Sequence, residues 1–378
     1  IEVSDLIKEQ LMESLKMYVT FEPKEENFSR SFGKVNQHRT YFHTGGILKK
    51  FDERELINKN LPQPKKLSQK QKTEIIKCSR IALCLLNRET DPITYCNEDG
   101  LMYYELEHGL SIALFSMLPK RRLPLESYIG FMMFKNGYPM AYGGGWVFGK
   151  RSLLGINIFE AFRGGESAFV FAQLLRTYKN AFGATYFEVE PYQFGKDNPE
   201  GIQSGAFWFY YRFGFRPVDE NLNKLANDEF LKIQSEKNYR SGFAILKQFT
   251  KCNVSVNFSG NQKPVNPSDI SKYVSQQIIK QFNGDRNAAE KWCNAKLKKE
   301  LALRQAQDDK NVGIKKLNLF YGLCLKTEKI SAKEKTILKK FILEKGNDEF
   351  AYIKLCNEIN FDLFFVNHPN SKNNNADR

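Results

Sequence analysis

The sequence predicts a mixed α/β fold, of the α+β type, in which helices flank a central sheet. A helical arm is expected before this part of the chain and an all-α appendage after it. Three observations predict this class. Between about residues 127 and 217 the apolar pattern changes repeatedly from strand period to helix period, whereas on both sides of that stretch it is helical only. The 378 residues, of which 42% are hydrophobic and 26% charged, suffice for two or three domains.

Residues 1–72 are expected to form the helical arm and a linker. Residues 1–18 mix acidic and apolar side chains at helical spacing, without the basic start and apolar middle of an export signal. Residues 61–72 contain two prolines, several lysines and little to bury. We therefore place a domain boundary at residue 72.

Residues 73–250 are expected to form the α/β domain. Helices are predicted over residues 73–86, 109–118, 168–175 and 205–213. Strands are predicted over residues 127–134, 138–148, 152–159 and 185–189. The dipeptide Asn136-Gly137 predicts a hairpin turn, and the Gly143-Gly144-Gly145 run predicts a bulge or a close backbone approach. This order requires at least one parallel strand pair joined by a right-handed crossover.

Residues 251–366 are rich in lysine and are expected to be helical, and residues 367–378 are expected to be a loose tail. Helices are predicted over residues 270–282, 287–303, 316–325, 332–343 and 349–359. The formal charge of the chain is +14, and residues 251–378 contribute 23 Lys and Arg against 14 Asp and Glu. Basicity favours polyanionic partners, although alternating acids and few interleaved aromatics argue against nucleic-acid binding.

Composition also limits the kinds of site. The seven cysteines are scattered and form no Cys-x-x-Cys pair, and the chain has four histidines. Neither a disulfide framework nor a metal site is expected, and a reducing cytoplasm is the expected compartment. No run of about 18 apolar residues is present, so no membrane span is expected.

The turn at residues 163–168 is the first candidate binding element. It joins a predicted strand to a predicted helix, and the N–H groups at a helix N-terminus attract phosphate. Gly164 and Gly165 allow close approach, Ser167 offers a hydroxyl, and Arg163 adds charge. An ordinary strand-to-helix turn would have the same composition.

A second element lies about 40 residues later, where residues 203–215 read QSGAFWFYYRFGF. With Arg163-Gly-Gly-Glu-Ser-Ala168, this run resembles the two signatures of the GNAT superfamily of acyl-CoA N-acyltransferases, including bacterial members. The resemblance covers about residues 95–250. It departs at Glu166, where the family has glycine, and at Gln203, where it has asparagine. The turn could then use Gly164 and Gly165, or hold the donor differently, or not bind it.

The resemblance implies a fold, a donor and several roles. It implies a splayed sheet, with the pantetheine arm of acetyl-CoA or another acyl-CoA lying between the strands at residues 153–159 and 185–191. Arg163, Gly164, Gly165, Ser167, Ala168 and Gln203 would bind the donor. An amine would attack the thioester directly. Tyr210 matches the tyrosine that protonates or hydrogen-bonds the leaving thiolate, although its helical spacing with Ala206, Phe209 and Phe213 also fits a packed core residue.

Carboxylates near the two strands are candidates for the general base. Strand alternation places Tyr186, Glu188 and Glu190 on one face, and Glu160 ends the neighbouring strand. Carboxylates that converge in the splay would raise one another's pKa into the range of a base. Salt-bridged acids at a sheet end are the alternative. The resemblance also implies an acceptor pocket shaped by the early helices, with Glu105, Glu107 and His108 as candidate contacts; exposed polar residues of a helix are the alternative.

The sequence therefore predicts an enzyme that transfers an acyl group to an amine of unknown identity. Because acyl carrier proteins are acidic and carry the same pantetheine arm, a basic surface could also accept that donor. A binding module or scaffold with a GNAT-like fold that has lost its chemistry is the alternative, supported by Glu166. Association with nucleic acid is a weaker third.

Overall fold

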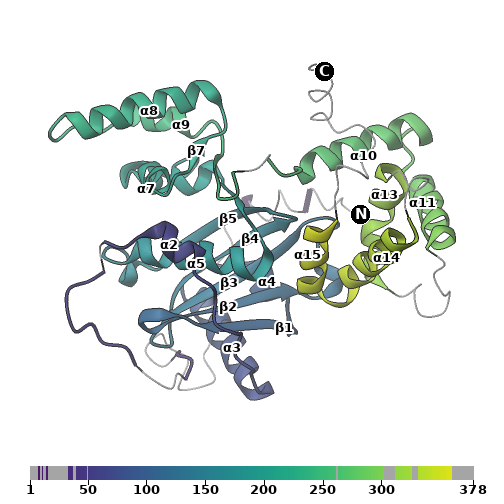
Figure 1. Ribbon diagram of the computed structural model, residues 1–378, viewed down its shortest axis with the longest axis horizontal. Helices are drawn as coiled ribbons and strands as arrows, with labels where there is room; N and C mark the ends of the chain where they lie inside the picture. The colour runs from purple at the N-terminus through teal and green to yellow at the C-terminus, as the bar shows by residue number, and fades with distance from the viewer. Residues whose placement is uncertain are drawn as a thin grey trace.

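The computed structural model describes residues 7, 8, 11, 14, 15, 33–36, 40–48, 50–260, 263–301, 311–325 and 331–359. Within these residues the centre is a sheet of eight strands in the order β1-β2-β3-β4-β5-β6-β8-β7, with helices around it (Figure 1). The prediction of a mixed α/β fold is confirmed. Most of the helix expected over residues 1–18 lies outside the described residues. The tail expected over residues 367–378 lies entirely outside them.

The first five strands form an antiparallel meander. They are β1 (Cys96–Glu105), β2 (Leu110–Met117), β3 (Ser127–Lys135), β4 (Tyr138–Phe148) and β5 (Arg151–Ile158). In the β3–β4 turn, Asn136 and Gly137 have φ angles of 50° and 83°, as a two-residue hairpin of Asn-Gly requires. The predicted hairpin is confirmed.

The sheet then becomes mixed. Helix α5 (Ser167–Phe182) connects β5 to β6 (Tyr186–Val189), which runs parallel to β5. Strand β8 (Val254–Asn257) pairs antiparallel with β6 and with the short β7 (Arg216–Pro217). The expected parallel pair with its helical crossover is present.

The helix expected over residues 109–118 is wrong, because these residues form β2. All eight residues of β2 are buried, so the strand is apolar on both faces and shows no alternation. A short continuous apolar run of this kind cannot be told from a buried helix by periodicity. Its partner β1 was not predicted.

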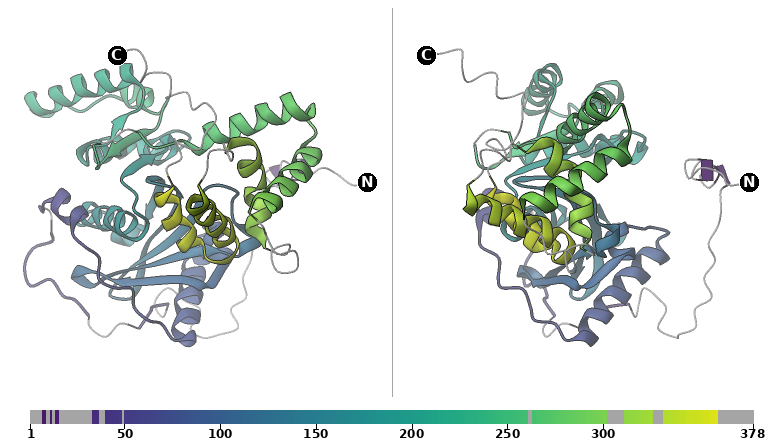
Figure 2. Two further views of the ribbon diagram at one scale, coloured as in Figure 1. Left: turned by 45° about the vertical axis from the view of Figure 1, so that its right-hand side comes forward. Right: turned by 90° about the vertical axis from the view of Figure 1, so that its right-hand side faces the viewer.

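Helices cover both faces of the sheet (Figure 2). On one face, α3 (Gln69–Leu85) and α4 (Asp91–Thr94) pack over a core that includes Phe115 and Phe134. On the other, α5 packs with α2 (Glu53–Asn58), and the Tyr178 hydroxyl donates to the carbonyl of Ile129 at 2.6 Å. A Ser68–Gln71 capping box fixes the start of α3.

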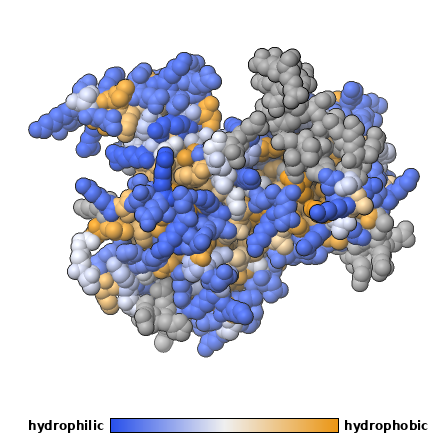
Figure 3. All heavy atoms as spheres, in the orientation of Figure 1, coloured by the Kyte–Doolittle hydropathy of each residue, from blue (hydrophilic) through white to orange (hydrophobic). Residues whose placement is uncertain are grey.

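A helical insertion separates β6 from β8. It contains α6 (Pro199–Gln203), α7 (Ala206–Arg212), α8 (Glu220–Ser235) and α9 (Phe243–Phe249). Helix α8 projects away from the sheet in Figure 1, and its surface is mostly hydrophilic on the face shown in Figure 3.

All five helices expected after residue 251 are confirmed. They are α10 (Pro267–Phe282), α11 (Arg286–Glu300), α13 (Val312–Cys324), α14 (Ala332–Asn347) and α15 (Glu349–Glu358). They are not detached from the sheet. Phe350 stacks on Phe182 of α5 with ring centroids 5.7 Å apart, and the Gly149 N–H donates to Cys356 Sγ at 3.1 Å. Strand β8 begins after residue 250 and is part of the sheet. The boundary expected at residue 250 therefore separates β8 from the other strands of the same sheet.

Candidate functional site

Strands β5 and β6 pair over only half of β5. The register runs from Arg151 opposite Tyr186 to Leu154 opposite Val189. β5 then continues to Ile158, while the chain after β6 turns into the short helix η4 (Pro191–Phe194). Among the described residues, the edge of β5 from Gly155 to Ile158 therefore has no strand partner on the β6 side.

Two side chains cover this free edge instead. Ile156 N–H donates to Gln193 Oε1 at 3.2 Å, and Arg163 Nε donates to the carbonyl of Ile158 at 3.1 Å. The Arg163 side chain is 59% exposed, and Gln193 is half-buried. Because both side chains can rotate away, an extended ligand with amide groups could take their place and pair with β5 as an added strand.

The turn of residues 163–166 leads from this edge into α5. Gly164 has a φ of 111°, a value that only glycine adopts without strain. Glu166 stands at the N-cap of α5 but accepts no hydrogen bond from the first turn, and no other described side chain caps it. The first N–H groups of α5 and the positive end of its dipole are therefore available to an anion.

The Glu166 carboxylate contacts two side chains from other parts of the chain. Lys135 Nζ, at the end of β3, lies 2.9 Å from one carboxylate oxygen, and His43 Nε2 lies 3.2 Å from the other. Lys135 therefore compensates the negative charge that the sequence places at this turn.

Residues 41–48 and 50–51 pass over the same turn, which the sequence did not predict. A Cβ added at Gly165 would lie 2.7 Å from the Ile47 side chain, and the Phe51 ring packs edge-on against Phe169 at 5.5 Å. A bound anion would therefore share this surface with Ile47.

The donor-binding candidates lie on two segments, which the ion pair of Arg163 with Glu200 of α6 joins at 3.6 Å. Arg163, Gly164, Gly165, Ser167 and Ala168 lie in one turn and the first turn of α5. Gln203 is exposed at the end of α6, and Gly205, with a φ of 65°, separates it from α7. The two signatures thus lie on three helices.

Tyr210 lies in an aromatic cluster next to η4. Its ring contacts Phe171 of α5 at 5.5 Å and Phe194 of η4 at 6.2 Å, and the residue is 4% exposed. Burial raises the pKa of Tyr210 well above its ordinary value of 10. Among the described residues its hydroxyl has no hydrogen-bond partner, so both expected roles, packing and hydrogen bonding to a ligand, are compatible with its position.

The candidate carboxylates do not converge, which corrects the expectation of a shared site. Glu188 is 3% exposed and forms a buried ion pair with Arg151, whose guanidinium also donates to Asn266 Oδ1 at 2.7 Å. Glu160 and Glu190 are exposed and line two different cavities. The sequence predicts the alternation along β6, but it does not predict that Arg151 at the start of β5 pairs with Glu188.

Glu105, Glu107 and His108 are also placed differently from expectation. They lie at the β1–β2 hairpin: Glu105 ends β1, and Glu107 and His108 belong to the short 3-10 helix η1 (Glu107–Gly109) that joins the two strands. Glu107 accepts hydrogen bonds from Arg176 at 2.7 Å and from Gln173 at 2.9 Å, both on α5. Glu107 therefore anchors the hairpin to α5.

The cavity that Glu190 lines, which we call the polar cavity, lies over the point where β5 and β6 separate. Its volume is about 250 Å³. It is lined by four aromatic residues, by two carboxylates and by the paired glycines Gly144 and Gly155; these residues are Tyr128, Tyr142, Trp146 and Tyr192 with Glu89 and Glu190. Tyr128 and Trp146 are stacked, with ring centroids 4.2 Å apart. Burial, together with the charges of Asp91 and Glu190, raises the pKa of Tyr128.

The sequence did not predict this cavity, although one pattern indicates it. The Gly143-Gly144-Gly145 run places no side chains on part of β4, and a Cβ at Gly144 would lie 2.4 Å from the Tyr128 ring. Glycine in a strand weakens it, so such a run indicates close approach.

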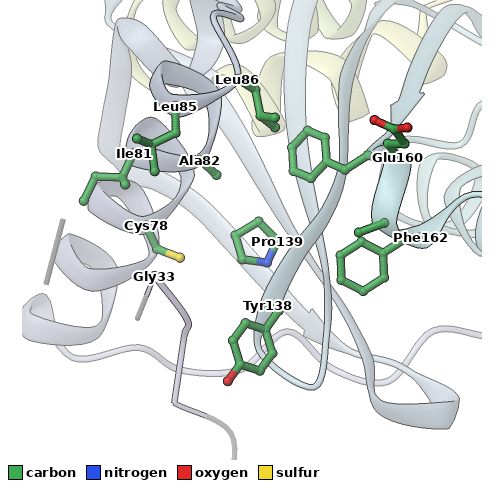
Figure 4. Close-up of a pocket in the computed structure, with 12 residues that line it drawn as sticks. Gly33, Cys78, Ile81, Ala82, Leu85, Leu86, Tyr138, Pro139, Glu160 and Phe162 are labelled. Atoms are coloured by element: carbon green, nitrogen blue, oxygen red, sulfur yellow. The ribbon is translucent and has the colours of Figure 1, made fainter. Parts of the chain in front are cut away.

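The cavity that Glu160 lines, which we call the apolar cavity, has a volume of about 230 Å³. Figure 4 shows Cys78, Ala82 and Leu85 of α3 on one side and Pro139 and Phe162 on the other. Its lining is mainly aliphatic and aromatic, with the Glu160 carboxylate at its edge in Figure 4.

The described part of the chain contains no group of three or more His, Cys, Asp or Glu side chains able to hold a metal ion. None of its helices combines the length and the apolar character needed to cross a bilayer. Comparison with known proteins adds no relative: no family model, no curated protein and no solved structure matches the chain.

Proposed function

We propose that this chain transfers an acyl group from a coenzyme A thioester to an amine. The observation that carries the proposal is the free edge of β5, which leads through residues 163–166 to the uncapped N-terminus of α5. A pantetheine arm has amide groups that suit a strand edge, and its diphosphate suits a helix N-terminus. The GNAT resemblance of residues 163–168 and 203–215 supports the same donor.

In this proposal the amine attacks the thioester carbonyl, a C–N bond forms, and the thiolate leaves as the C–S bond breaks. Glu190, which lines the polar cavity, accepts the proton of the amine through water. Tyr210 lies beside η4, the segment that carries Gln193 and faces the free edge. Because burial raises its pKa, Tyr210 keeps its proton and acts on the thiolate as a hydrogen-bond donor.

Calorimetric titration with coenzyme A, acetyl-CoA, octanoyl-CoA and acetylated acyl carrier protein tests the donor. We expect at least one thioester to bind with a Kd of about 1 μM to 1 mM. Arg163→Gln should weaken binding about tenfold, the effect of one charge-assisted hydrogen bond. The matched control is Arg212→Gln, an exposed arginine on α7. If no thioester binds, the proposal is wrong; if one binds without amine-dependent thiol release, the chain is a binding module.

A second candidate function, association with a polyanion, has its own observation. A cavity of about 770 Å³ between α10, α13 and the β2–β3 loop is lined by Lys120, Arg286, Lys315 and Lys316, and its described lining includes no carboxylate. A labelled oligonucleotide should then bind with a steep salt dependence that Lys315→Glu with Lys316→Glu reduces. Salt-independent or absent binding would exclude this candidate.

A further inference from the structure

The polar and apolar cavities lie end to end along one groove. Three segments line them in the same order. After α3, Leu85 and Leu86 line the apolar cavity, and Glu89 and Thr90 line the polar one. On β4, Tyr138 and Pro139 line the apolar cavity, and Tyr142 and Gly143 line the polar one. On the third segment, Phe159, which follows β5, lines the apolar cavity, and Asn157 of β5 lines the polar one.

A pair of contacting rings connects the linings of the two cavities. The rings of Tyr142, which lines the polar cavity, and Phe159, which lines the apolar one, have centroids 5.6 Å apart. Tyr142 lies on β4 and Phe159 directly follows β5, and both pack in the core that α3 covers. One elongated molecule that passes these rings would therefore reach both cavities.

The charge at the polar end contrasts with the rest of the chain. Glu89 and Glu190 line it, and the charge of Asp91 raises the pKa of Tyr128. A described cation, Arg88, opposes them, and its charge counteracts the rise in the pKa of Tyr142. The local balance is therefore negative in a protein of net charge +14. Carboxylates combined with four aromatic side chains are the surroundings that bind an ammonium group, through ion pairing and cation–π attraction.

The other end of the groove suits a different part of the same molecule. Ile81, Leu85, Pro139 and Phe162 present aliphatic and aromatic surface. A hydrocarbon group of the ligand would remove this surface from water, and burial of apolar surface favours binding.

We propose that this groove binds an amphiphilic amine, with its ammonium group at the carboxylates and aromatic rings of the polar cavity and its hydrocarbon group in the apolar cavity. This inference rests on the proposed function in that it names the class of acceptor, a primary amine with an apolar tail. The amine nitrogen then lies over the point where β5 and β6 separate, beside the proposed thioester.

Calorimetry with three probes, without any acyl donor, tests the proposal. These are octylamine, propylamine, which lacks the tail, and 1-octanol, which lacks the charge. We expect octylamine to bind at least ten times more tightly than either of the others. Equal binding of octylamine and 1-octanol would contradict the ammonium site, and equal binding of octylamine and propylamine would contradict the tail site.

Variants separate the two ends of the groove. Glu89→Gln with Glu190→Gln should weaken octylamine binding about tenfold and leave 1-octanol unchanged, whereas the control Asp228→Asn, an exposed acid on α8, should change neither. Ala82→Phe, which fills the apolar cavity, should reduce octylamine binding to the level of propylamine. Unchanged octylamine binding in both the charge and the filling variants would overturn the proposal.

The outcome is distinguishable from failure of the proposed function. Octylamine binding without any binding of coenzyme A or its thioesters would leave the amine site standing and exclude acyl transfer. Thiol release that shows no preference for octylamine over propylamine would leave acyl transfer standing and exclude the amphiphilic acceptor.

Discussion

At the scale of single residues, Tyr210 shows how a packed side chain and a functional one can be told apart. Its ring is held by Phe171, Phe194 and Phe215, so its position depends on the ring and not on the hydroxyl. The hydroxyl has no partner among the described residues. Replacing it should therefore affect a ligand more than it affects the fold.

We predict that Tyr210→Phe changes the free energy of unfolding by less than about 0.5 kcal/mol, because no hydrogen bond is lost. Thiol release should fall by about 10- to 100-fold if the hydroxyl stabilises the leaving thiolate. Urea denaturation and a thiol-release assay on the same preparation measure the two effects. An undiminished rate would assign Tyr210 to packing alone.

Glu107 is a residue whose role is structural. Burial alone would raise the pKa of Glu107, but hydrogen bonds from Lys59 and Gln173 and the charge of Arg176 outweigh it and lower the pKa to about 2. A carboxyl group whose pKa is lowered in the folded state stabilises the fold at pH values above its ordinary pKa of 4.5. This stabilisation is lost as the pH falls toward 2.

We predict that Glu107→Gln lowers the free energy of unfolding by about 1 kcal/mol at pH 7, a modest value because solvent screens a partly exposed carboxylate. The difference from the unchanged protein should shrink between pH 4.5 and pH 2. Glu105→Gln is the control, since Glu105 pairs with Lys65 while 48% exposed. A pH-independent difference would mean that the charge of Glu107 is not the cause.

At the scale of elements, the sequence predicted most helices and the strands with a clear turn or alternation. Helix α5 and β3–β4 were found because a stripe and an Asn-Gly turn mark them. β2 was misassigned because it is buried on both faces, and β1 was missed because Asn97 to Gly100 interrupt its pattern with polar residues and glycine. These elements depend on their neighbours in the sheet more than on their own sequence.

The candidate site was predictable to a similar degree. The turn at residues 163–168 was identified because local chemistry defines it. The ion pair of Glu188 with Arg151, the cover of Ile47 over Gly165 and the groove between α3 and β4–β5 are contacts between segments far apart in the sequence. Period and composition do not specify such contacts.

Gln193 provides an element-scale prediction about the separated strands. Its side chain occupies the Ile156 N–H, which an incoming donor would need. We predict that Gln193→Ala lowers the free energy of unfolding by about 0.5–1 kcal/mol and tightens thioester binding about threefold, because one competing hydrogen bond is removed. Calorimetry with a coenzyme A thioester that binds the unchanged protein measures this. Weaker binding would mean that Gln193 contacts the donor instead of competing with it.

At the scale of the whole molecule, buried charges attach the C-terminal helices to the sheet. Arg122, which follows β2, lies 3.3 Å from Glu349 of α15, and Lys345 of α14 lies 3.1 Å from the same residue. Lys345 also donates to the carbonyl of Glu126 at 3.0 Å. All three charged side chains have no exposed surface. Glu349 is the carboxylate that both buried cations contact.

We predict that Glu349→Leu lowers the free energy of unfolding by about 3–5 kcal/mol, because two buried cations lose their counter-charge. Lys345→Met should cost less, about 1–2 kcal/mol, since the Arg122–Glu349 pair remains. The control is Glu290→Leu, which removes the exposed Arg286–Glu290 pair of α11 and should cost less than about 1 kcal/mol. Urea denaturation at pH 7 measures all three.

The pH dependence of the same variant identifies the cause. Burial lowers the pKa of Lys345 from its ordinary 10.5, against the opposing effect of Glu349, and removing Glu349 lowers it further. Between the lowered pKa of the folded state and 10.5, the folded state binds fewer protons than the unfolded state, so stability rises with pH in that range. The deficit of Glu349→Leu should therefore be smaller at pH 9.5 than at pH 7. A deficit that does not change with pH would show that lost packing, and not the unpaired cations, destabilises the variant.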